Sequence, residues 1–151
     1  MFKKIKSIIL AEISKGLTPL KLTQSLVSGL LIGCFPILGT TSILGFLVGT
    51  FFNLNHAVLQ AANYLMYPVQ LLLIPIYIKI IASILSMKDV PIRPDLIIKL
   101  FIKDPWEFLS KFFLIGIGQI ILWLVVSSIL YFILMKALSP LVLALKEKKN
   151  D

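Results

Sequence analysis

The chain has 151 residues, enough for one domain, with 58% hydrophobic residues, a mean hydropathy of +0.98 and a formal net charge of +8. Soluble domains are about 45–50% apolar, so the composition disfavours a soluble globular protein and indicates lipid as the solvent. One cysteine and one histidine exclude an internal disulfide and a metal site built on these ligands. The sequence shows no catalytic dyad or triad and no phosphate-binding loop, so it predicts neither an enzyme nor a cofactor.

The positive charges gather in three groups beside the apolar parts of the chain. The groups are Lys3, Lys4, Lys6, Lys15 and Lys21; Lys88, Arg93, Lys99, Lys103 and Lys111; and Lys136, Lys146, Lys148 and Lys149. Basic groups that flank apolar spans are typical of cytoplasmic loops and of contact with anionic phospholipid. Nucleic-acid binding would need an accompanying motif, which is absent from the sequence, so we expect no nucleic-acid partner.

Residues 1–16 are basic and contain a short apolar run, and they predict a short amphipathic helix lying on the inner membrane interface. The alternative is a solvated tail. The run from Ile8 to Ala11 is too short for a signal peptide. The N-terminus is therefore expected in the cytoplasm, while the side of the C-terminus stays open because every polar segment is rich in lysine.

An apolar core of broken helices is predicted over residues 17–87. Thr18-Pro19 is a helix-start signal, and the stretch GCFPILGTTS (Gly33–Ser42) interrupts the helix that follows. Thr40 or Thr41 is expected to cap a second helix. Each half has room for about a dozen residues, roughly 20 Å at ~1.5 Å per residue, which is less than the ~30 Å hydrocarbon core. The halves form either one kinked helix or a re-entrant hairpin.

Two ladders of small residues favour the hairpin. Each ladder has a four-residue spacing, and the two mirror each other around Ile37: Ser25, Gly29 and Gly33, then Thr41, Gly45 and Gly49. Small residues at this spacing let helices approach closely in lipid. We therefore expect these residues to pack the hairpin, with Gly33 opposite Thr41, Gly29 opposite Gly45 and Ser25 opposite Gly49.

After the hairpin the sequence predicts a polar turn at Asn53–His56 and a helical piece over 57–66, with interruptions at Pro68 and Pro75. A polar connector over 88–111, with an amphipathic helix from Pro94, is expected next. A transmembrane helix over 112–138 and a basic tail over 139–151 end the predicted order. Asp104-Pro105 is a strong helix-start signal, and Ser139-Pro140 is expected to start a last short helix. The predicted fold is an all-α, polytopic helical membrane protein, a single membrane domain (1–151) with one clear C-terminal span.

Polar side chains around the interruption allow two interpretations. The amides of Asn53, Asn55, Gln60, Asn63 and Gln70 either pair with backbone freed at the prolines or line a polar cavity. A helix that starts at Thr40-Thr41 would also point N–H groups and hydroxyls at the interruption, where they would hold an anion such as a phosphate. The chain has no carboxylate between Glu12 and Asp89, so coupling through a buried acid is not expected.

The pattern of glycines and prolines resembles the family of small bacterial membrane proteins known as domain of unknown function 2062. The matching residues are Gly29, Gly33, Phe35-Pro36, Gly39, Thr41, Asn55, Pro68 and Pro75-Ile76-Tyr77. The chain departs from that family at Asn53, where the family often has Arg. It also has Tyr67 in place of the family's Asn and Gln70 in place of the family's Thr. The resemblance implies a multi-pass protein of the bacterial cytoplasmic (inner) membrane and implies no activity.

Two functional hypotheses follow. In the first, the chain handles a lipid or an anionic solute through the re-entrant hairpin, as a transporter would. Its candidate functional residues are Gly33, Phe35, Pro36, Gly39, Thr40, Thr41, Ser42, Asn55, Asn63, Pro68 and Gln70. In the alternative, it is a non-catalytic membrane subunit or scaffold whose helix-packing residues (Ser25, Gly29, Gly45 and Gly49) bind a partner protein or a second copy.

Overall fold

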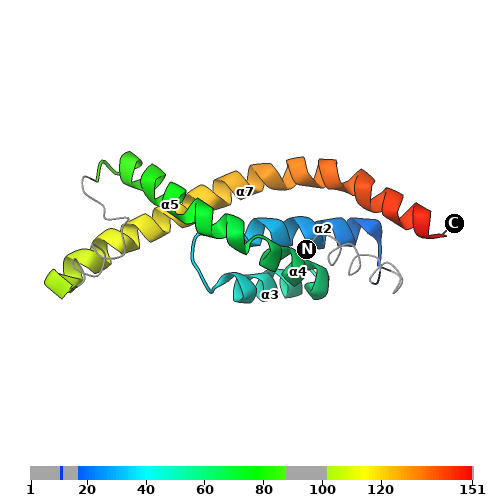
Figure 1. The fold of residues 1–151 in the computed structure, drawn as a ribbon, viewed down its shortest axis with the longest axis horizontal. Helices are drawn as coiled ribbons and strands as arrows, with labels where there is room; N and C mark the ends of the chain where they lie inside the picture. The colour runs from blue at the N-terminus through cyan, green and yellow to red at the C-terminus, as the bar shows by residue number, and fades with distance from the viewer. Residues whose placement is uncertain (1–10, 12–16, 88–101, 151) are drawn as a thin grey trace.

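The computed structural model describes residue 11 and residues 17–87 and 102–150, with the side chains of 107, 111 and 147–150 excepted. Five helices form this part of the chain (Figure 1): α2 (Pro19–Ile32), α3 (Thr41–Phe51), α4 (His56–Leu65), α5 (Tyr67–Ile84) and α7 (Pro105–Asn150). The all-α prediction is confirmed. The predicted helices within 1–16 and from Pro94 lie outside the described residues.

The helix starts follow local capping chemistry. Thr18 Oγ1 accepts the Lys21 N–H at 3.3 Å, with Pro19 in the first turn of α2. Asn55 Oδ1 accepts the Val58 N–H at 2.9 Å and caps α4. Each side chain satisfies one of the N–H groups that the first turn of a helix leaves without a partner. The start predicted at Pro105 is also confirmed.

The chain doubles back at the interruption. Residues 33–40 carry it from the end of α2 to the start of α3, with Gly39 at a φ of +81°. Lys21 Nζ donates to the Phe52 carbonyl oxygen at 3.0 Å, and the Asn55 N–H donates to Ser25 Oγ at 2.8 Å. The start of α2 therefore lies beside the end of α3 and the start of α4. Helix α3 runs antiparallel to α2, and α4 runs parallel to it (Figure 1).

The two ladders of small residues contact α4, so their predicted pairing with each other is wrong. A Cβ on Gly29 would collide with the Leu59 carbonyl oxygen and lie 2.8 Å from Ala62 Cβ. A Cβ on Gly45 would lie 2.9 Å from Leu59 Cδ2. Leu59 thus lies between the two ladders.

The outer positions of the ladders follow the same arrangement. A Cβ on Gly33 would lie 2.7 Å from the Asn63 carbonyl oxygen, and one on Gly49 would lie 2.7 Å from the His56 ring. The symmetry of the ladders reflects a third helix lying against both half-helices. The spacing of small residues on α2 and α3 does not indicate that a third helix lies against them.

The interruption predicted at Pro68 is present, because α4 ends at Leu65 and α5 begins at Tyr67, with Pro68 in its first turn, where a missing N–H costs nothing. The interruption predicted at Pro75 is wrong, because Pro75 lies inside α5 without ending it. Pro140 lies inside α7, so the predicted separate helix from Ser139 is wrong, and the helix that contains the predicted span continues to Asn150. The Ser139 hydroxyl donates to the Met135 carbonyl oxygen at 2.7 Å, four residues earlier in the same helix, so it does not act as a helix cap.

Two described helices are long and apolar enough to cross a membrane: Tyr67–Ile84, and Phe108–Lys146 within α7. The sequence had indicated only the second as a clear span. In both, only 17% of the most apolar stretch is buried. Helix α7 packs along α2 and crosses α5, where a Cβ on Gly118 would lie 2.7 Å from Ile81 Cγ2 (Figure 1).

Candidate functional site

The C-terminal end of α2 is held by side chains from the two long helices. Three donors reach backbone carbonyls in the last turn of α2 and just after it: Gln70 Nε2 to Phe35 O at 2.7 Å, Tyr77 OH to Cys34 O at 3.3 Å and Trp123 Nε1 to Leu31 O at 3.0 Å. Carbonyls at the end of a helix lack intrahelical donors, and leaving them unpaired away from water is costly. For Gln70, the geometry therefore agrees with the first interpretation of the amides, in which they pair with freed backbone.

A second polar chain joins α3 to α4. Gln60 Nε2 donates to the Ser42 carbonyl oxygen at 2.9 Å, and Asn63 Nδ2 donates to Gln60 Oε1 at 3.0 Å. Because the Ser42 carbonyl can only accept, it fixes the orientation of the Gln60 amide, which in turn fixes that of Asn63. The remaining oxygen of Asn63 is thereby directed away from this chain.

Three buried oxygens near the interruption have no hydrogen-bond partner among the described residues: Thr41 Oγ1, Asn63 Oδ1 and Gln70 Oε1. Their side chains are at most 1% exposed. Two of these atoms can only accept a hydrogen bond. They come from the starts of α3 and α5 and from α4, and of the three side chains Gln70 also donates to the interruption, at the Phe35 carbonyl oxygen.

The predicted anion site at the start of α3 has fewer available donors than the sequence indicated. Thr40 precedes the helix but makes no side-chain cap, and its hydroxyl donates to the Ile37 carbonyl oxygen at 2.9 Å. The Ser42 hydroxyl donates to the Tyr64 hydroxyl at 3.3 Å. The protons of both hydroxyls are thus used within the chain.

The other candidate residues divide between the two ends of α2 and α4. Phe35 packs edge-on against Trp123, with ring centroids 4.9 Å apart, and Pro36 is buried beside it. Gly39 is exposed in the turn, and Pro68 is exposed in the first turn of α5. Asn55 caps α4 at the opposite end. Gly33, Asn63 and Gln70 therefore gather with Phe35 and Pro36 at the interruption, while Asn55 does not.

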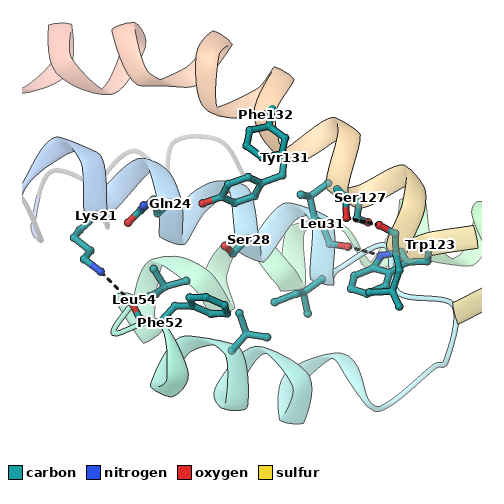
Figure 2. Close-up of a pocket in the computed structure, with 14 residues that line it drawn as sticks. Lys21, Gln24, Ser28, Leu31, Phe52, Leu54, Trp123, Ser127, Tyr131 and Phe132 are labelled. Atoms are coloured by element: carbon teal, nitrogen blue, oxygen red, sulfur yellow. Dashed lines mark hydrogen bonds between the residues drawn. The ribbon is translucent and has the colours of Figure 1, made fainter. Parts of the chain in front are cut away.

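A groove between α2, the C-terminal end of α3 and α7 has a volume of about 570 Å³ (Figure 2). We call it the α2–α7 groove. Its lining is mostly apolar and includes Leu31, Ile32, Val48, Trp123 and Leu124. Ligand pockets in proteins typically measure about 300–1,000 Å³, so the groove is of ligand size.

Polar side chains gather toward one end of the α2–α7 groove. Lys21, Gln24 and Tyr131 lie there, and the Tyr131 hydroxyl points toward Gln24 (Figure 2). Trp123 and Leu31 mark the other end, joined by their hydrogen bond. The ten residues from Lys21 to Leu31 correspond to about 15 Å along the helix axis. The groove is thus long, with its one charged side chain, Lys21, at one end, which we call the polar end, and with Trp123 and Leu31 at the other, the apolar end, where Ser127 also lies.

The groove residues were not among the candidates named from the sequence. Most of them lie on α2 and α7, about a hundred positions apart, the others lie at and after the C-terminal end of α3, and they share no local motif. Trp123 carried one usable signal, because an indole in the middle of an uncharged span must find an acceptor for its N–H. Lys21 carried another as the last charged residue before Lys79.

No protein-family model matches the chain, and neither a curated protein nor a solved structure matches it. The resemblance to domain of unknown function 2062 therefore stays a prediction, and the function must be argued from the geometry alone.

Proposed function

We propose that the chain is an integral membrane protein that binds a membrane lipid in the α2–α7 groove. Support for the membrane begins with exposure: α5 and α7 turn most of their apolar side chains outward, whereas the core helix of a soluble protein would be mostly buried. In this arrangement α5 and α7 span the bilayer, and the short α2 and α3 form a re-entrant hairpin.

The groove is the observation that carries the lipid assignment. Three of its lining side chains are strongly exposed, Phe52 at 58%, Leu124 at 51% and Phe132 at 75%, so the groove opens onto the apolar surface. An acyl chain lying along the groove would bury its own apolar surface and that of the side chains that line the groove. The hairpin gives the protein a transporter-like element, and the groove lies along its first half.

The alternative, a scaffold that binds partners through its ladders of small residues, has less support. Gly29, Gly33, Gly45 and Gly49 approach α4 so closely that an added Cβ would lie within 3 Å of it. These surfaces are therefore occupied within the chain and do not offer a free face to a second helix.

Native mass spectrometry of the detergent-extracted protein tests the lipid assignment. Ser28 lines the groove, so Ser28→Phe should fill part of it and remove lipid adducts seen on the wild type. Ser83→Phe, at an exposed position of α5 outside the groove, is the matched control and should keep them. Equal adducts on both variants would contradict the proposal.

A second measurement serves if Ser28→Phe is poorly folded. In a Trp106→Phe background, Trp123 is the one remaining tryptophan and lies in the groove. A lipid with a brominated acyl chain is added to the delipidated protein in detergent and should quench Trp123 fluorescence. The quenching should reach saturation while the lipid is still a small fraction of the detergent. Quenching that merely follows the bulk lipid fraction would argue against a bound lipid.

A further inference from the structure

The polar end of the α2–α7 groove contains the Lys21 ammonium group, which has no carboxylate partner among the described residues. Asp104 is the one acid whose side chain the structure describes, and it precedes α7. Lys21 lies near the opposite end of α7, because its neighbour Leu22 packs against Val142. Among the described residues, the positive charge of Lys21 is therefore not neutralised by an acid.

The hydrogen bonds of Lys21 leave donors over. A lysine ammonium has three N–H groups, and one donates to the Phe52 carbonyl oxygen at 3.0 Å. This bond holds the amine between the end of α3 and the groove (Figure 2). Gln24 and Tyr131 add a neutral amide and a phenol at the same end. Among the described residues the Phe52 carbonyl oxygen is the acceptor bonded to the ammonium, so two of its N–H groups are left for a ligand.

The position of Lys21 relative to the bilayer fits a headgroup. The same end of the helices carries the exposed polar turn with Asn53 and His56, while the apolar end of the groove lies about 15 Å further along α2. Lysines near helix ends extend their amines to the membrane interface, where lipid phosphates lie. A lipid aligned with the groove would place its chain against Trp123 and its phosphate at Lys21.

We infer that the α2–α7 groove selects a phospholipid with a net negative headgroup, whose phosphate is bound by Lys21. This inference rests on the proposed lipid binding and adds the class of headgroup and its orientation. One lysine near a membrane surface contributes about 1 kcal/mol toward an anionic lipid, which corresponds to about five-fold in affinity. The preference is therefore modest and measurable.

Competition between two lipids with identical acyl chains tests the inference. Native mass spectrometry should show phosphatidylglycerol bound about five-fold more tightly than phosphatidylcholine. Lys21→Gln, which keeps a donor for Phe52 and removes the charge, should reduce the ratio to about one, whereas Lys21→Arg should keep it. Lys79→Gln is the matched control, because Lys79 is exposed on α5 outside the groove, and it should leave the ratio unchanged.

Measurements on the wild type provide a test that does not depend on a folded variant. Raising the salt concentration should shrink the preference for phosphatidylglycerol, since screening weakens a charge interaction. Free glycerol phosphate should not displace the lipid. Displacement by glycerol phosphate would assign the polar end to a soluble anion and overturn the inference.

The remaining outcomes separate the two proposals. Equal affinity for both lipids, with binding lost in Ser28→Phe, would overturn headgroup selection and leave the lipid groove standing. An equal effect of Lys21→Gln and Lys79→Gln would show a general surface-charge effect and overturn it too. Absence of lipid adducts, together with a dimer mass in the same spectrum, would assign the groove to a second copy and overturn both.

Discussion

Gly29 is the position where the packing of α2 on α4 can be tested most sharply. In Gly29→Ala the new methyl group would collide with the Leu59 carbonyl oxygen and lie 2.8 Å from Ala62 Cβ. The Leu59 carbonyl oxygen belongs to the backbone, so the collision can be relieved only if α4 moves as a unit. Overpacking costs about 1–3 kcal/mol, and a backbone obstacle places the cost near ~3 kcal/mol. Alanine returns about 1 kcal/mol through helix propensity, so we expect a net loss of about 2 kcal/mol.

Gly116→Ala is the matched control for this change. It makes the same substitution in α7, where an added Cβ would meet no atom within 4 Å. Propensity alone then predicts a gain of up to about 1 kcal/mol, so the two variants should differ by about 3 kcal/mol. Equilibrium unfolding in mixed micelles, with a denaturing detergent as titrant, measures the difference. Equal stability of the two variants would refute the close approach of α2 and α4.

Three further predictions follow from single contacts. Thr41→Val removes a buried hydroxyl that has no partner among the described residues, so the free energy of unfolding should stay the same or rise by about 1 kcal/mol; a clear fall would reveal a bound partner. Tyr77→Phe deletes the bond to the Cys34 carbonyl oxygen and should lower the free energy of unfolding by about 1 kcal/mol in the same titration. In a Cys34→Ser background, single cysteines at Thr18 and Asn55 should react with an impermeant thiol reagent from the same side of the membrane, whereas labelling from opposite sides would exclude a re-entrant hairpin.

Helix starts were the part of the fold that the sequence predicted best. Thr18-Pro19 and Asp104-Pro105 each combine a side chain that can cap with a proline suited to the first turn, and helices begin at both places. Such signals are local, because the capping atom and the N–H that it accepts lie three residues apart. The interruption at residues 33–40 was predictable for the same reason.

The partner of each ladder was not predictable. A four-residue spacing shows that one face of a helix is small, but it does not say which helix approaches that face. The mirrored spacing of the two ladders led to the prediction that they pack against each other, whereas in the structure α4 packs against both. The cause lies in Leu59 on α4, whose backbone carbonyl lies against Gly29 and whose side chain lies against Gly45.

The prolines show how apolar context overrides a local rule. In a soluble helix an internal proline costs about 3 kcal/mol, which justified ending helices at Pro75 and Pro140. Both helices continue through these residues. In long apolar helices prolines are tolerated, because neighbouring groups re-satisfy the freed backbone. The second long helix, α5, was missed for this reason.

Trp123 links the interruption to the groove. Its indole N–H binds the Leu31 carbonyl oxygen at the end of α2, and its ring packs on Phe35 while lining the α2–α7 groove. The Leu31 carbonyl oxygen also accepts the Cys34 N–H at 3.1 Å, and the indole from α7 adds a second donor to it. The same side chain therefore closes the apolar end of the groove. A lipid chain that reaches this end would contact the residue that fixes the hairpin, so occupancy of the groove and stability of the hairpin should be coupled through Trp123.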